Sequence, residues 1–115
     1  DYEGAIYDCT QGIILDPNNY KFFACRGIAK SLQGKKRDAL KDLNRAIELE
    51  PNPFQMETYY WRGVLKFSMR RKDRSFIDRT ACSDLKKAHN AGFQFAIDYA
   101  EQNQSFLQRD KCYGM

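Results

Sequence analysis

Apolar residues recur along this chain at the spacing of amphipathic helices. Between 36 and 49, Ala39, Leu40, Leu43, Ala46 and Ile47 lie on one face of a helix, at steps of one, three and four. Segments with a similar rhythm follow before and after it, separated by Pro, Gly and Asn. The pattern predicts six helices, over about 2 to 15, 20 to 33, 36 to 49, 54 to 70, 77 to 91 and 94 to 108.

Residues at the expected helix ends support these boundaries. Gly34 suits the left-handed residue that ends a helix, and Asn52-Pro53 suits a cap followed by a first-turn proline. Ser75 and Asp78 form a candidate capping pair for the fifth helix.

The first and third helical segments are copies of one another at a shift of 34 residues. Six of the 19 positions of 1–19 are identical in 35–53. The identical pairs are Ala5/Ala39, Asp8/Asp42, Ile13/Ile47, Leu15/Leu49, Pro17/Pro51 and Asn18/Asn52. Each copy is an amphipathic helix that ends before a proline.

The second and fourth segments are also copies, at a shift of 36. Arg26-Gly27-Ile28 matches Arg62-Gly63-Val64, and Lys30 matches Lys66. KDLNRA at 41–46 matches SDLKKA at 83–88 at a shift of 42, which predicts six extra residues within about 70–80. The chain therefore alternates two kinds of helix.

Size and composition indicate one folded unit. The 115 residues suffice for one compact core, and 43% hydrophobic with 30% charged residues is a globular balance. No apolar run approaches the length of a membrane span, and the first residues have no signal-peptide pattern. The amphipathic start without Met suggests a fragment or a processed chain. We expect a soluble protein, cytoplasmic or, if an upstream signal was removed, periplasmic.

The 34-residue helix-turn-helix period, with Gly and Ala at fixed places before a closing Pro, resembles the tetratricopeptide repeat. Phe23 stands near that family's usual Trp, whereas Arg26 replaces its usual Leu. The resemblance implies an all-α fold, a right-handed superhelix of antiparallel helix pairs. It divides the single domain, 1–115, into the second helix of a truncated repeat (2–19), a complete repeat (20–53), a repeat with an extended inter-helix loop (54–92) and a capping helix (93–109). The C-terminal stretch looks like the end of certain bacterial arrays or like Sel1-type repeats.

A charge pair recurs with the repeat. Arg26 and Asp42 return as Arg62 and Asp84, and Asp8 is the acidic member of a third pair whose basic member is missing. Because the pairs follow the fold's own period, we interpret them as structural ties between the two helices of a repeat.

The resemblance also implies a binding surface, because the first helices of such repeats line a concave groove. In this chain the groove would present Lys21, Ala24, Ile28, Leu32, Glu57, Tyr60, Val64 and Phe67. Aromatic side chains there would supply binding energy, although they could instead pack as core. Some family members grip an acidic C-terminal tail with Lys, Asn and Arg. Here Cys25, Glu57 and Trp61 stand at comparable places, which argues against such a clamp and favours a peptide or partner helix held by apolar contacts.

The inter-helix turns carry a second candidate surface. Equivalent turns stack along one edge of a helical-repeat array, so their basic residues would form a ridge. The residues are Lys35, Lys36, Arg37, Arg70, Arg71, Lys72 and Arg74. A solvated edge is the simplest interpretation. The alternatives are an acidic protein, an anionic membrane surface or RNA, although the modest net charge of +4 makes nucleic acid a poor candidate.

No catalytic, metal or cofactor motif is present. The chain has no GxSxG, HExxH or phosphate loop, and its one histidine, His89, has no neighbouring ligand. The four cysteines include no CxxC, so we expect them to be buried as small apolar side chains. A disulfide between Cys82 and Cys112 is the alternative if the protein resides in an oxidising compartment. We therefore expect a non-catalytic scaffold without a cofactor that binds a protein or peptide of unknown identity. The alternative is a structural spacer within a larger array.

Overall fold

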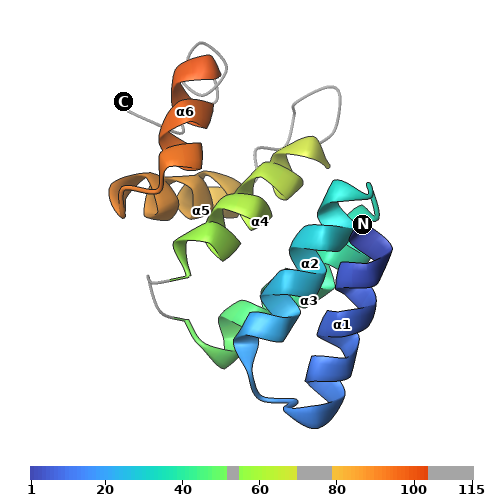
Figure 1. Ribbon diagram of the computed structural model, residues 1–115. Coiled ribbons are helices and arrows are strands. Elements are labelled where there is room, and N and C mark those ends of the chain that lie inside the picture. Colours follow the sequence, from blue (N-terminus) through green and yellow to red (C-terminus); the bar gives the residue numbers. More distant parts are fainter. Residues whose placement is uncertain (52–54, 70–78, 104–115) are drawn as a thin grey trace.

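The computed structural model describes residues 1–51, 55–69 and 79–103, and all statements below concern these residues. They form helices and no strands, so the expectation of an all-α protein is confirmed. The helices are α1 (Tyr2–Leu15), α2 (Tyr20–Leu32), α3 (Lys36–Leu49), α4 (Met56–Ser68), α5 (Arg79–Asn90) and α6 (Gln94–Gln102) (Figure 1).

Two helices end in the same glycine motif. Gly34 has φ of +84° and Gly92 has φ of +82°, a conformation that suits glycine because it has no Cβ. After α2, the N–H of Lys35 donates to the carbonyl of Lys30, and after α5 the N–H of Phe93 donates to Ala88. These are the bonds of a Schellman cap, and they turn the chain sharply into the next helix. The prediction for Gly34 is confirmed.

The fourth helix begins later than predicted, at Met56 instead of residue 54. Gln55, which precedes it, is buried and directs its side-chain amide to the end of α3. That amide donates to the carbonyl oxygens of Ala46, at 2.9 Å, and of Glu50. The Ala46 carbonyl also accepts from the N–H of Glu50, so Gln55 is its second donor, while the Glu50 carbonyl is one of those that the end of a helix leaves without an intrahelical partner. The predicted Asn52-Pro53 cap lies outside the described residues.

The sixth helix is shorter than predicted, because it ends at Gln102 and not at 108. Asn103 donates from both its backbone N–H and its side-chain amide to the carbonyl of Tyr99. The remainder of the predicted helix, 104–108, lies outside the described residues. The same is true of the Ser75/Asp78 capping pair and of most of the insertion expected within 70–80.

The helices form antiparallel pairs arranged in sequence order. α2 packs against α3 and α4 packs against α5, while α1 packs on α2 and α3 contacts α4. Figure 1 shows α1, α2 and α3 side by side, with α6 at the opposite end of the molecule from α1. Each helix thus contacts its neighbours along the chain.

Within each helix pair, the two helices approach each other at an equivalent glycine. A Cβ on Gly27 would lie 2.9 Å from the Leu43 side chain and 3.2 Å from the carbonyl oxygen of Ala39. A Cβ on Gly63 would lie 2.8 Å from Leu85 and 3.1 Å from the carbonyl of Ala81. The same residue types meet at the repeat spacings of 36 and 42, so the internal repeat is also a repeat of packing.

Two apolar clusters hold the pairs together. One consists of Ala39, Leu43 and Leu65, with Ile28, Leu40 and Trp61 against it, and it links α2, α3 and α4. The other consists of Phe67, Ala81, Cys82 and Leu85, with Tyr60, Val64, Tyr99 and Ala100 against it. The second cluster joins α4 and α5 to α6.

Candidate functional site

A buried carboxylate joins α2 to α3. Arg26 donates from Nε and Nη2 to the two oxygens of Asp42, both at 2.8 Å. The Nζ of Lys30, one turn further along α2, lies 3.1 Å from the same carboxylate. Asp42 is 5% exposed, and its hydrogen bond raises the pKa of Arg26 above its ordinary value, so the guanidinium stays charged. The structure brings this predicted pair together.

The next repeat contains the same constellation. Arg62 donates from Nε and Nη2 to the two oxygens of Asp84, both at 2.7 Å. Lys66 lies 4.0 Å from this carboxylate. Asp84 is 1% exposed. Each pair has the two parallel hydrogen bonds that the planar guanidinium makes with a carboxylate.

Each arginine also reaches the preceding helix, which the sequence reasoning missed. The Nη1 of Arg26 donates to Oγ1 of Thr10 on α1 at 3.3 Å, and the Nη1 of Arg62 donates to Oδ1 of Asn44 on α3 at 3.1 Å. Thr10 and Asn44 are 34 residues apart, so the shift that aligns the repeats also aligns these acceptors. The recurrence of a polar residue at positions 10 and 44 is the sequence feature from which these hydrogen bonds could have been predicted.

Asp8 occupies the position of Asp42 on α1, but its surroundings differ. It is exposed to solvent, whereas Asp42 and Asp84 are buried. Within the part of the chain that the structure describes, Asp8 has no ion pair. Among the described residues, the carboxylate of Asp8 thus differs from those on α3 and α5, each of which pairs with an Arg and a Lys.

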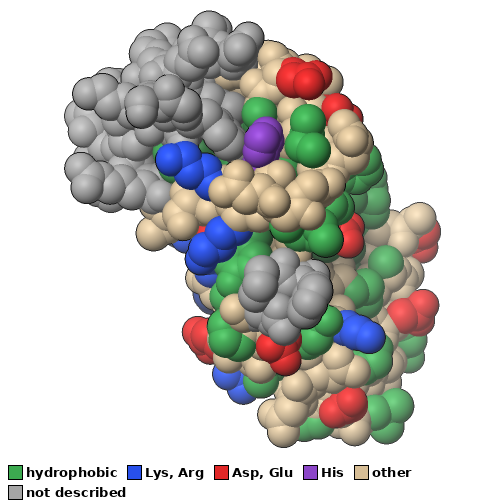
Figure 2. Space-filling model, turned by 90° about the vertical axis from the view of Figure 1, so that its left-hand side faces the viewer, with side chains coloured by type: hydrophobic (Ala, Val, Ile, Leu, Met, Phe, Trp, Pro, Cys, Tyr) green, Lys and Arg blue, Asp and Glu red, His purple; other side chains and the backbone are tan. Residues whose placement is uncertain are grey.

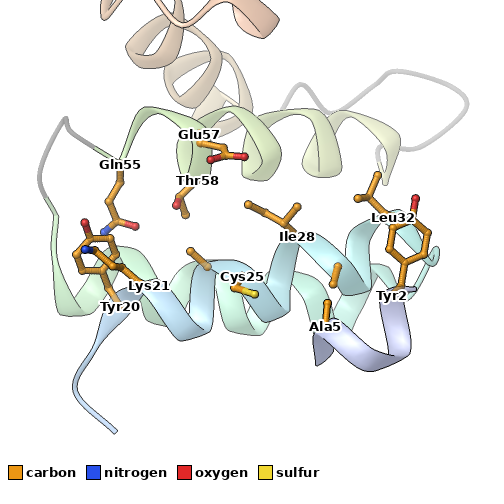
Figure 3. Close-up of a pocket in the computed structure, with 12 residues that line it drawn as sticks. Tyr2, Ala5, Tyr20, Lys21, Cys25, Ile28, Leu32, Gln55, Glu57 and Thr58 are labelled. Carbon is orange, nitrogen blue, oxygen red and sulfur yellow. The ribbon is translucent and has the colours of Figure 1, made fainter. Parts of the chain in front are cut away.

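A groove of about 540 Å³ runs along α2 between the start of α1 and the start of α4. Figure 3 shows Ile28 and Cys25 along α2, with Glu57 and Thr58 facing them from α4 and Tyr2 closing one end. Five predicted groove residues line it: Lys21, Ala24, Ile28, Leu32 and Glu57. The prediction missed Tyr2, Ala5, Tyr20, Cys25, Ala29, Gln55 and Thr58.

The other three predicted groove residues lie elsewhere. Phe67 is 7% exposed, and it packs with Ala81, Cys82 and Leu85 rather than facing a groove. Val64 packs against the same cluster. The Tyr60 ring lies 5.5 Å from Phe93, 6.2 Å from Phe95 and 6.1 Å from Tyr99. These three residues therefore do not line the groove along α2 and lie on the side of α4 that faces α5 and α6.

Trp61 contributes to packing as well. Its ring lies 5.4 Å from that of Tyr60 in an edge-on arrangement, and it rests against the cluster of Ala39, Leu43 and Leu65. Burial, with the nearby Asp98 carboxylate as a second cause, raises the pKa of Tyr60. Tyr60 thus belongs to the α4–α6 junction, whereas Trp61 packs where α4 meets α3.

A disulfide between Cys9 and Cys25 ties α1 to α2. The expectation of four apolar cysteines was wrong for this pair. The two residues lie 16 apart on different helices, a spacing that carries no motif. Cys9 is buried, while Cys25 is exposed in the groove. Cys82 is buried and disulfide-bonded too, whereas Cys112 lies outside the described residues.

The groove has a polar end at Gln55. Its side-chain nitrogen donates to the carbonyl of Ala46 on α3, but its Oε1 is buried without a hydrogen-bond partner. Lys21 and Glu57 are exposed at the groove, so it carries one charge of each sign. The remaining lining is mostly apolar, which suits contacts with side chains of a bound segment.

The basic ridge is described only in part. Lys35, Lys36 and Arg37 are exposed at the α2–α3 turn, and Lys36 Nζ lies 3.4 Å from the carbonyl of Ser68 at the end of α4. The other members, Arg70, Arg71, Lys72 and Arg74, lie outside the described residues. On the face shown in Figure 2, basic, acidic and apolar side chains alternate over the described surface.

The described residues offer no metal centre. No group of three or more His, Cys, Asp or Glu side chains among them has the geometry to hold an ion. His89 is partly exposed near the end of α5. None of the helices in the described ranges combines the length and apolarity that crossing a membrane requires.

Comparison with known proteins adds no family assignment. No protein-family model matches the chain, and a search of curated proteins finds no match. In the ranges that the structure describes, the fold is thus all-helical, with packed helix pairs and a lined groove along α2.

Proposed function

We propose that this chain is a non-catalytic interaction module of the tetratricopeptide type, which binds a peptide or partner helix in the groove along α2. The groove itself carries the proposal. It combines an apolar floor at Ala24, Ile28 and Ala29 with the exposed charges of Lys21 and Glu57.

Its dimensions support a peptide-sized ligand. A volume of about 540 Å³ falls within the range of sites that enclose small ligands or a few side chains. The walls come from α1, α2 and α4. The disulfide ties α1 to α2, the Arg26–Asp42 pair ties α2 to α3, and Gln55 ties the start of α4 to the end of α3. A preformed groove loses little entropy on binding.

Three features support the tetratricopeptide proposal. Helix pairs recur, glycines meet Leu and Ala at equivalent positions, and each arginine reaches back to the preceding helix. A stack of such pairs would form the right-handed superhelix that the resemblance implies. The division into a truncated repeat, two further repeats and a capping helix belongs to the same proposal.

Selection from a displayed library of random peptides tests the groove. Enriched peptides would be measured against the wild-type chain and an Ala24→Arg variant, which places a long charged side chain on the wall of the groove. We expect affinity to fall by at least about tenfold, since an unpaired charge in an apolar contact is costly. Glu57→Lys should change which charged peptides bind.

Arg45→Glu supplies the matched control, because Arg45 is exposed on α3 and does not line the groove. It should leave the selected peptides bound. Failure to enrich any peptide, or equal binding by Ala24→Arg and the wild type, would count against the groove and favour a structural spacer.

A further inference from the structure

Gln55 leaves one hydrogen-bonding group of the groove unsatisfied. The residue is 3% exposed, and its Nε2 donates to the carbonyl oxygens of Ala46 and Glu50 at the end of α3. These two bonds orient the amide so that its oxygen is left over, and Oε1 is buried without a hydrogen-bond partner. A buried carbonyl oxygen without a donor is costly. This end of the groove therefore lacks a donor that a bound molecule can supply.

Gln55 lines the groove at the end where both α2 and α4 begin. Figure 3 shows its side chain directed from the start of α4 toward Tyr20 and Lys21 of α2, whereas Leu32 lies at the opposite end. Lys21 and Glu57 are both exposed at the groove, and their opposite charges give this end no net preference for an anion or a cation. A neutral donor thus suits the oxygen of Gln55 better than a charged one.

The apolar positions along α2 have a spacing that suits an extended chain. Ala24, Ile28 and Leu32 line the groove at steps of four residues. Four residues of a helix rise about 6 Å. Two residues of an extended chain rise about 6.6 Å, and their side chains point to the same face. Every second side chain of an extended peptide can therefore lie over one of these three residues.

We infer that the occupant of the groove is an extended peptide rather than a helix, and that one of its main-chain N–H groups donates to Oε1 of Gln55; this rests on the proposed function. A helix uses its N–H groups internally beyond the first four. An extended segment presents such a group at about every 3.3 Å along its length. The main chain then supplies the neutral donor, and the apolar positions of α2 select the side chains.

Methylation of single amide nitrogens tests this contact, because it removes one main-chain donor at a time. The probes are linear peptides selected on the wild-type chain whose binding Ala24→Arg weakens, so that they occupy the groove. At one position, the loss of affinity on methylation should be at least about fivefold larger for the wild type than for Gln55→Met, as expected for one hydrogen bond. Steric effects of the methyl group occur with both proteins and cancel in this double-mutant cycle.

Two further variants serve as controls. Gln55→Lys lacks the acceptor but keeps a nitrogen that can donate to the carbonyls of α3, so it should respond to methylation as Gln55→Met does. Gln33→Met is the matched control, because Gln33 also has a buried Oε1 without a hydrogen-bond partner but does not line the groove. It should show the response of the wild type.

The conformation of the bound peptide gives a readout that needs no variant of Gln55. Carbon chemical shifts of an isotope-labelled peptide should have extended-chain values when it is bound, and helical values would overturn the inference. An equal response to methylation by the wild type and both Gln55 variants would overturn it as well, while the groove proposal would stand. A selection that enriches no peptide would overturn both together.

Discussion

Asp42 illustrates how much depends on a single buried carboxylate. Its removal would leave Arg26 and Lys30 without their shared partner in a half-buried position between α2 and α3. We predict that Asp42→Ala lowers the free energy of unfolding by about 2 to 4 kcal/mol, because an uncompensated charge is costly there. Urea unfolding followed by circular dichroism measures the loss.

Asp8 offers a matched control for this prediction, because it occupies the same repeat position but is exposed. Asp8→Ala should leave the melting temperature unchanged. If Asp42→Ala had the same melting temperature as the wild type, the Arg26–Asp42 pair would contribute nothing to stability.

Gly63 gives a prediction in which two effects have opposite signs. Helix propensity alone would make Gly63→Ala stabilising by about 0.5 to 1 kcal/mol. The added Cβ, however, would lie 2.8 Å from Leu85 and 3.1 Å from a backbone carbonyl oxygen. We predict a net destabilisation of about 1 to 3 kcal/mol, as for overpacked cores. A higher melting temperature for the variant would mean that α4 and α5 separate easily.

At the scale of helices, the sequence predicted the features that depend on local pattern, namely helix bounds and a glycine cap. α1 and α3 have the predicted bounds, and Gly34 ends α2 as expected, because periodicity and caps are local properties. The start of α4 was misplaced, since Gln55 bonds to carbonyls that only the folded chain brings near. Five residues that the family resemblance placed in a groove line the groove along α2, whereas Tyr60 lies against Tyr99 of α6, a tertiary contact that a local pattern does not show.

The junction of α4 and α6 predicts a dependence on alkaline pH. Burial raises the pKa of Tyr60 above its ordinary value, so the folded protein favours the neutral phenol. Its contribution is complete below the unfolded pKa of about 10 and is lost as the pH rises through the folded pKa. Tyr60→Phe should therefore lose less stability than the wild type between about pH 9 and 11. Melting temperatures of both proteins across this pH range test the prediction. It would be contradicted if the melting temperatures of the wild type and Tyr60→Phe fell in parallel as the pH rises.

The bond between α1 and α2 predicts a dependence on redox state. A cross-link closing a loop of about 15 residues contributes about 3 kcal/mol in the chain-entropy model, and Cys9 and Cys25 are 16 residues apart. Cys9→Ala/Cys25→Ala should therefore melt at a lower temperature than the oxidised wild type.

Reductant supplies the control for this redox prediction. Because Cys82 is disulfide-bonded as well, reductant should still lower the melting temperature of the double variant, but by less than in the wild type. Equal melting of the oxidised wild type and the double variant would show that α1 needs no covalent tie.

At the scale of the whole molecule, few contacts join the α2–α3 pair to the α4–α5 pair. Arg62 reaches Asn44, Leu65 enters the cluster of Ala39 and Leu43, and Gln55 bonds to the end of α3. In a linear array, cooperative unfolding depends on such interfaces between neighbours. The strength of these few contacts therefore determines whether the two pairs unfold together.

Gln55→Ala tests this coupling, because it removes the side chain that binds two α3 carbonyls from the start of α4. We predict a loss of about 1 kcal/mol, the net value of one hydrogen bond, because the Glu50 carbonyl loses its donor while the Ala46 carbonyl keeps the N–H of Glu50. Trp61 is the only tryptophan and reports on α4, whereas far-ultraviolet circular dichroism reports on all helices. In the wild type the two signals should change at the same urea concentration. In Gln55→Ala the tryptophan transition should come first, since α4 loses its attachment to α3. Coincident transitions in the variant would mean that the remaining contacts, among them those of Leu65, Trp61 and Arg62, suffice to couple the two helix pairs.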